Sequence, residues 1–93
     1  MFYTHILRSR TSGRWYTGFT KNLRKRLSLH RRSKVQYTAD KGPYDLFYYE
    51  ACEDQYDALA RERYLKSGMG KRYLRKRLKR LLALTGGGRR DGV

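Results

Sequence analysis

The stretch FYTHILRSRTSGRWYTGFT, residues 2–20, contains two runs of aromatic, β-branched and aliphatic side chains that flank a polar segment. The first run, residues 2–8, and the second, residues 14–19, each have the composition and alternation of a β-strand. The segment Arg10-Thr11-Ser12-Gly13 between them consists of turn-forming residue types. We therefore predict a β-hairpin at the start of the fold.

The predicted turn sets the register of the hairpin. It places Leu7 opposite Tyr16 and His5 opposite Gly18. His5 and Tyr16 then lie diagonally on one face of the sheet. Gly18 has no side chain, so it is expected to leave room above it for a substrate atom.

Downstream of the hairpin, helix and strand signals alternate. We predict a helix over residues 21–31 with Thr20 as its cap, and a third strand over residues 44–51. A second helix is expected to open at Glu53 or Asp54.

Two further signals complete the order of elements. The second helix is expected to stop at Ser67-Gly68, where Gly68 suits a left-handed cap. A last helix over residues 70–84 places its leucines on one stripe, and its other faces are nearly all Lys and Arg. The order ββαβαα predicts an α+β fold, with a small three-stranded, mainly antiparallel sheet flanked by helices.

The composition favours one basic domain. The chain has 93 residues, enough for a single domain with a modest core, which we place at residues 1–84. Residues 85–93, rich in Gly and Arg, are expected to be a disordered tail. Lys and Arg total 23 against 8 Asp and Glu, a formal charge of +15. Natural partners for such a chain are polyanions, and nucleic acid (DNA or RNA) is the leading candidate.

Other classes of protein fit the sequence less well. The longest apolar run, residues 81–84, is too short to span a bilayer, so no membrane association is expected from it. The first residues lack the features of a signal peptide. Cys52 is the one cysteine and cannot form an internal disulfide or a metal cluster alone. These features favour a cytoplasmic protein, and no feature of the sequence predicts a dimer, so we expect a monomer.

Two polar residues of the first predicted helix occupy positions where an amphipathic pattern expects apolar ones. Leu23, Arg26, Leu27 and His30 follow the i, i+3, i+4, i+7 spacing of a buried face. One interpretation is that Arg26 snorkels outward and that His30 lies in a frayed helix end. The other is that the helix faces a cleft in which Arg26 meets phosphate oxygens.

Glu62 is unexpected in the same way on the second predicted helix. It lies between Ala58, Leu59 and Leu65, and a carboxylate on an apolar stripe costs desolvation energy unless it is paired or binds a metal. An ion pair with Lys66 at i+4 is the plain explanation. A bound Mg²⁺ is the functional one, because this ion often uses one or two carboxylates and completes its shell with water and phosphate.

Taken in order, these residues resemble the GIY-YIG nuclease superfamily, in particular its small single-domain branch. The resemblance covers residues 2–80 and is carried by Tyr16-Thr17-Gly18, Arg26, His30 and the pattern Ala58-Leu59-x-x-Glu62. It implies a metal-dependent endonuclease or phosphodiesterase that acts on DNA or RNA, with a possible role in repair or processing of structured nucleic acid. It also implies one Mg²⁺ or Mn²⁺ ion held by Glu62.

One position departs from the pattern of the superfamily. The first motif of the superfamily ends in a tyrosine, and His5 stands at that position here. A free imidazole has a pKa of about 6.5 and is mostly neutral near pH 7, so His5 is a suitable replacement for the general base. Tyr3 is a second candidate. The plain alternative is that His5 is an ordinary half-buried strand residue.

The resemblance and the residues together predict a reaction. Water activated by His5, with Tyr16 close by, attacks phosphorus, and Arg26 stabilises the charge on the non-bridging oxygens. His30 orients the water or a phosphate. These four side chains and Glu62 are expected to converge in one electropositive hollow.

The remaining prediction concerns how nucleic acid is held. Phosphate contacts are expected from Lys21, Arg24, Lys34, Lys71 and Arg72. The main alternative to an enzyme is a catalytically impaired nucleic-acid-binding module on the same scaffold, which the changed first motif and the basic last helix favour. A third alternative is binding to an anionic membrane surface through that helix.

Overall fold

The computed structural model describes residues 1–31 and 43–85, apart from the side chains of His30, Arg31 and Thr85. The chain forms two compact units, Met1–Glu62 and Arg63–Val93. The predicted tail lies outside the described residues, except for Thr85.

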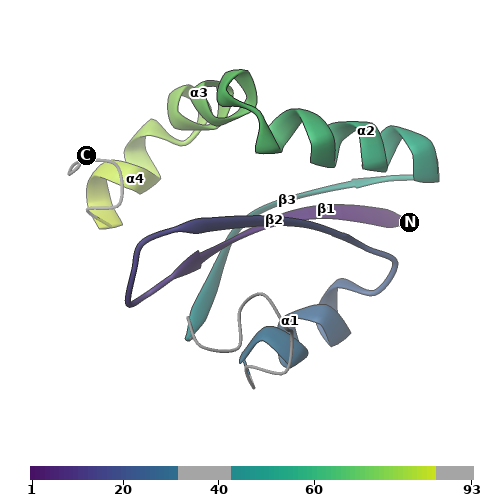
Figure 1. Cartoon of the computed structure of the whole chain (residues 1–93), viewed down its shortest axis with the longest axis horizontal. Helices are drawn as coiled ribbons and strands as arrows, with labels where there is room; N and C mark the ends of the chain where they lie inside the picture. Colours follow the sequence, from purple (N-terminus) through teal and green to yellow (C-terminus); the bar gives the residue numbers. More distant parts are fainter. Residues whose placement is uncertain (32–42, 86–93) are drawn as a thin grey trace. The chain divides into compact units, whose positions relative to one another are not determined.

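The first unit is built on three antiparallel strands, β1 (Phe2–Ser9), β2 (Trp15–Thr20) and β3 (Tyr44–Cys52), in the order β2-β1-β3 (Figure 1). The predicted α+β class and the three-stranded antiparallel sheet are thereby confirmed. The central strand supplies the core: Ile6 and Leu7, which point to opposite faces, are 0% and 1% exposed.

The hairpin has the predicted register. Leu7 lies opposite Tyr16, and His5 lies opposite Gly18. Directly opposed side chains share a face, so Leu7 and Tyr16 point the same way. His5 stands two residues before Leu7 on β1 and therefore points to that face too, as expected.

Local hydrogen bonds explain why the hairpin turns at this point. The Ser9 N–H donates to the Arg14 carbonyl at 3.0 Å, which closes a four-residue loop. The Ser9 hydroxyl accepts the N–H groups of Thr11 and Ser12, at 3.2 and 3.1 Å. Gly13 has φ 75°, a conformation that side-chain-bearing residues rarely adopt. The N–H groups of Thr11 and Ser12 and the positive φ of Gly13 therefore stabilise the turn that was predicted at residues 10–13.

Helix α1 (Leu23–Arg31) begins later than predicted, and its cap is Asn22. The Asn22 Oδ1 accepts the N–H of Lys25 at 3.0 Å. Thr20 is the last residue of β2, and its hydroxyl accepts the Asn22 N–H at 3.1 Å. The prediction of Thr20 as the cap was wrong because Asn22 stands three residues before Lys25, the spacing that an N-cap side chain requires.

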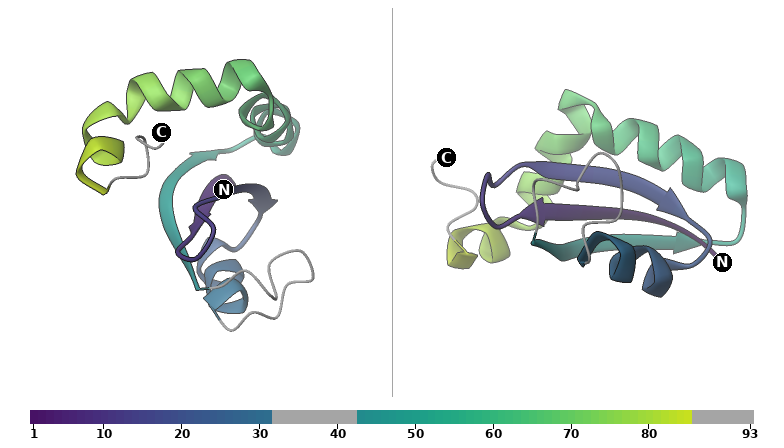
Figure 2. Two further views of the ribbon diagram at one scale, coloured as in Figure 1. Left: turned by 60° about the vertical axis from the view of Figure 1, so that its left-hand side comes forward. Right: turned by 60° about the horizontal axis from the view of Figure 1, so that its bottom comes forward.

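Helices α1 and α2 (Gln55–Lys66) cover opposite faces of the sheet (Figures 1 and 2). The Thr4 hydroxyl donates to the Ala58 carbonyl of α2 at 2.8 Å, so α2 lies on the face to which Thr4 points. Side chains alternate along β1, and the neighbouring His5 therefore points to the face that α1 covers.

The start of α2 agrees with the sequence. Asp54 is the cap, because its carboxylate accepts the N–H of Asp57 at 2.8 Å. An acidic cap is also favoured by the helix dipole.

The second unit contains the end of α2 and two further helices, α3 (Gly68–Arg77) and α4 (Lys79–Thr85). The predicted left-handed cap at Gly68 was wrong, because this residue has no positive φ and opens α3. Ser67 forms the boundary instead: its hydroxyl accepts the Gly70 N–H at 3.1 Å. A single serine thus caps the new helix without a left-handed residue.

The predicted single helix over residues 70–84 was also wrong. It is interrupted at Leu78, which has φ −109° and ψ 30° and donates its N–H to the Leu74 carbonyl at 2.8 Å. Neither Gly nor Pro stands at this junction, so the sequence carries no breaker signal there. Leu74 and Leu82, on either side of the break, are 0% and 4% exposed.

No helix among the described residues has the length and apolar character needed to cross a membrane.

Candidate active site

His5 lies on the central strand β1, points to the face that α1 covers, and is 2% exposed. Its imidazole ring lies against the backbone of Gly18: a Cβ at residue 18 would be 2.9 Å from both Cε1 and Nε2 of His5. The expected room for a substrate atom above Gly18 is therefore filled by His5. Glycine is required here for the packing of the imidazole ring.

Tyrosines surround His5 on the same face. Tyr16 lies one diagonal step away, and its ring meets Tyr44 edge-on with a centroid distance of 5.4 Å. On the other side, Tyr49 of β3 is directly opposite His5 and is 52% exposed. The Tyr49 ring is 6.1 Å from that of Tyr3. Residue 49 was predicted only to lie within the third strand, because its pairing partner in β1 depends on long-range registration.

The first helix brings Arg26 to the same side of the sheet as His5 and Tyr16. Arg26 lies on α1 and is half-buried. A half-buried guanidinium keeps its charge, so Arg26 can stabilise an anion bound at this face. His30 belongs to α1, but its side chain lies outside the described part of the chain, as does Lys34.

Glu62 belongs to a helix that covers the other face. It is a half-buried residue of α2, the helix that covers the Thr4 side of the sheet. The structure therefore groups His5, Tyr16 and the helix of Arg26 on one side, whereas the helix of Glu62 lies on the other. Which face each helix covers depends on how the chain connects the strands across the sheet. The spacing of residues in the sequence does not show this.

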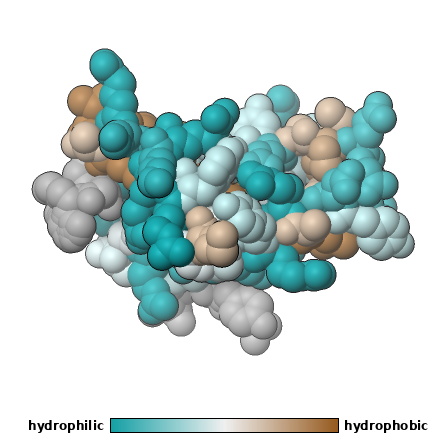
Figure 3. All heavy atoms as spheres, turned by 90° about the horizontal axis from the view of Figure 1, so that it is seen from above, coloured by the Kyte–Doolittle hydropathy of each residue, from teal (hydrophilic) through white to brown (hydrophobic). Residues whose placement is uncertain are grey.

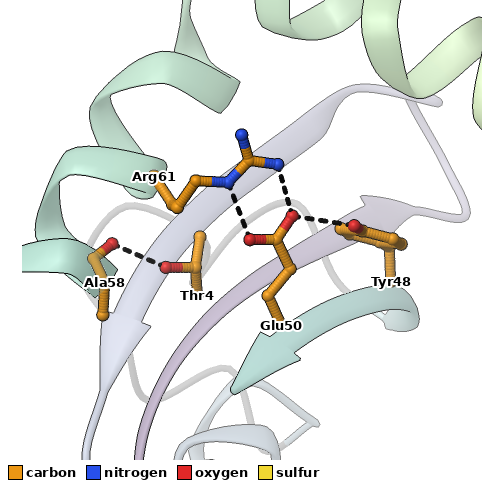
Figure 4. A network of polar contacts seen from close by, with 5 residues as sticks. All are labelled: Thr4, Tyr48, Glu50, Ala58 and Arg61. Atoms are coloured by element: carbon orange, nitrogen blue, oxygen red, sulfur yellow. Dashed lines mark hydrogen bonds and ion pairs between the residues drawn. The ribbon is translucent and has the colours of Figure 1, made fainter. Parts of the chain in front are cut away.

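The residues beside Glu62 are held by a polar network that the sequence analysis did not identify (Figure 4). Arg61 donates from Nε and Nη2 to the two carboxylate oxygens of Glu50, at 2.8 and 2.6 Å. The Tyr48 hydroxyl donates to the same carboxylate at 2.7 Å. Together with the hydrogen bond from Thr4 to Ala58, this network attaches α2 to β1 and β3.

The chemistry of the described residues suits a metal ion only in combination with substrate. No group of three or more His, Cys, Asp or Glu in residues 1–31 and 43–85 could hold an ion by itself. A single carboxylate such as Glu62 fits Mg²⁺ or Mn²⁺ when phosphate oxygens and water complete the shell. Metal binding at Glu62 would thus depend on the bound nucleic acid.

The basic residues predicted to contact phosphate are spread over both units. Lys21 and Arg24 are exposed in the first unit, and the Lys21 ammonium lies 5.8 Å from the centre of the Phe2 ring. In the second unit Arg72 is exposed and Lys71 is half-buried on α3. All four are basic side chains that are at least partly exposed, as phosphate contacts require.

Comparison with known proteins agrees with the motifs. The model of the GIY-YIG catalytic domain family matches residues 1–76. UPF0213 protein CPE1444 of Clostridium perfringens is 39% identical over 67 residues, 71% of each chain. UPF0213 protein OB0043 of Oceanobacillus iheyensis is 35% identical over 65 residues, 69% of this chain and 74% of its own. No solved structure gives a significant match.

Proposed function

Because the chain belongs to the GIY-YIG family, whose domains act on nucleic acids, we propose that it is a divalent-metal-dependent phosphodiesterase of DNA or RNA. The observation that carries this proposal is the hairpin register, which sets His5 against Gly18 and Tyr16 on the same face. The family is of the nuclease type and generally uses divalent metals.

In the proposed reaction, residues of the α1 side act on the phosphate. His5 accepts the proton of the attacking water, and the Tyr16 hydroxyl is a hydrogen-bond partner for that water or for a phosphate oxygen. Arg26 stabilises the negative charge that gathers on the non-bridging oxygens, and His30 orients the phosphate. Each role requires only a proton transfer or a hydrogen bond, which these side chains supply.

Glu62 is the proposed metal-holding residue. When bound there, a divalent ion supplies Lewis-acid stabilisation of phosphate oxygens. Since the helix of Glu62 lies on the opposite side of the sheet from His5, the substrate strand has to pass the edge of the sheet to meet both. This requirement favours a flexible or unpaired strand over a rigid duplex.

A cleavage assay tests the proposal. Branched, nicked and single-stranded substrates are incubated with the protein and Mg²⁺ or Mn²⁺, and Arg26→Gln and Glu62→Gln serve as variants. We expect metal-dependent cleavage by the wild type and at least a hundredfold loss in each variant, about 2.7 kcal/mol of transition-state stabilisation. Cleavage that survives both substitutions would refute the assigned roles.

Two observations support a second candidate, a nucleic-acid-binding module that has lost the chemistry. His5 is 2% exposed, and Glu62 lies on the helix of the opposite face. If the protein is such a module, the wild type binds nucleic acid but does not cleave it. Restoring the family's tyrosine by His5→Tyr would then create or strongly increase cleavage.

A further inference from the structure

Positive charge is segregated into the second unit. None of the chain's 8 Asp and Glu lies between residues 63 and 85. The same stretch contains Lys71-Arg72, Arg75-Lys76-Arg77 and Lys79-Arg80. Because α3 and α4 carry no carboxylate of their own, these cations give the two helices a strongly positive charge.

On α3 the cations follow the helix periodicity. Arg72, Arg75 and Lys76 are all exposed and stand at i, i+3 and i+4, so they share one face. Gly70 and Leu74, both buried, lie on the other side of the same helix. The outer face of α3, defined by Arg72, Arg75 and Lys76, is therefore cationic.

Two central leucines of these helices are buried: Leu74 is 0% and Leu82 4% exposed, so neither can enter a lipid bilayer without unpacking the unit. Met69 and Leu84 are 64% and 72% exposed, but they stand near the start of α3 and the end of α4 rather than along one stripe. A helix that binds a membrane surface needs an exposed apolar face beside its cationic one. Figure 3, which looks onto α2 and α3, shows mainly hydrophilic side chains with apolar ones scattered between them. The exposed chemistry suits an extended polyanion better than lipid.

We propose that the outer face of α3 binds the sugar–phosphate backbone of nucleic acid without reading its sequence. The proposal rests on the proposed function for the identity of the polyanion, and it adds a binding surface that requires neither metal nor catalysis. Arg and Lys at this spacing contact successive phosphates, and such contacts hold a strand without discriminating among bases.

The test measures the salt dependence of binding in EDTA, so that cleavage cannot contribute. Fluorescence anisotropy with a labelled DNA duplex is recorded over a series of NaCl concentrations for the wild type and Arg72→Gln/Lys76→Gln. Each lost phosphate contact lowers the slope of log K against log salt by about 0.9 on a duplex, so we expect a decrease of about 1.8. A second duplex of unrelated sequence should give the same result.

The matched control is Arg63→Gln/Lys66→Gln, which removes the same charge from α2 in the same unit. We expect it to lower the slope by less than half as much, and circular dichroism checks that both variants are folded. An equal decrease in the two variants, no decrease in either, or tighter binding to anionic phosphatidylserine vesicles than to the duplex would overturn the proposal. An inert protein with the expected slopes would refute the proposed nuclease activity and leave this surface in place.

Discussion

The network of Glu50, Arg61 and Tyr48 should be the strongest polar contribution to the attachment of α2. Side chains of Arg61 and Glu50 are 37% and 25% exposed, so the pair is neither fully buried nor a surface pair. Exposed pairs contribute about 0–1 kcal/mol, and loss of one partner from a buried pair costs about 3–5 kcal/mol. The bidentate geometry and the Tyr48 hydrogen bond make this pair stronger than an exposed pair, although it is weaker than a fully buried one. We therefore expect Glu50→Gln to lower the free energy of unfolding by about 1–2 kcal/mol.

A double-mutant cycle measures this energy. Glu50→Gln, Arg61→Gln and the double variant are unfolded in urea and followed by far-UV circular dichroism. The coupling energy should be about 1–2 kcal/mol, and each single variant should lower Tm by roughly 4–16 °C. Glutamine keeps the shape of Glu50 and can still accept the Tyr48 hydroxyl, so the cycle isolates the charge.

The chain offers a control pair with similar geometry and more exposure. Arg10 also makes a bidentate contact with Asp45, at 2.8 to 3.1 Å, but the two side chains are 63% and 41% exposed. Its hydrogen bond to Asp45, and then the charge of that carboxylate, raise the pKa of Arg10, so the guanidinium stays charged in the assay. Arg10→Gln/Asp45→Asn should show a far smaller coupling energy because water screens both groups. Equal coupling energies in the two cycles would refute the argument from burial.

Two glycines give further predictions. Gly70→Ala should destabilise the protein by more than about 2 kcal/mol, because its Cβ would overlap the Tyr64 carbonyl oxygen, and this overlap outweighs the gain in helix propensity of about 1 kcal/mol. Urea unfolding measures the loss, and Gly68→Ala, where no atom lies within 4 Å, is the control and should be neutral or stabilising. Gly18→Ala should cost about 1–3 kcal/mol, because the new methyl group meets the His5 ring at 2.9 Å. The same substitution made in a His5→Ala background should cost clearly less, and an equal cost in both backgrounds would show that the ring does not occupy that space.

Much of the fold could be predicted because it is set locally. The hairpin register followed from the turn at residues 10–13, since hydrogen bonds within a few residues select the turn and the turn selects the pairs. The start of the second helix was predicted at Glu53 or Asp54 for the same reason, and the structure selects Asp54. The cap of the first helix was wrongly predicted as Thr20, because Asn22 is an equally good capping residue and only the backbone path decides between them.

The site could be predicted only in part. The presence of His5 and Tyr16 on one face follows from the two-residue period of a strand, which sequence spacing reports directly. The burial of His5 against Gly18 could not be predicted in this way, because it depends on which later segments of the chain cover that face of the sheet. The pairing of Glu50 with Arg61 was missed because it joins a strand to a helix and depends on how that helix is rotated.

The order of elements up to the last predicted helix, the hairpin register and the excess of positive charge could be read from the chain, because all of them arise from neighbouring residues or from composition. Three features could be learned only from the folded chain: α1 and α2 lie on opposite faces, the helix of Glu62 lies on the face away from His5, and the last helix breaks at Leu78. Burial and contact between distant segments depend on three-dimensional packing. A periodic pattern shows which side chains share a face, but it does not show which neighbour that face will meet.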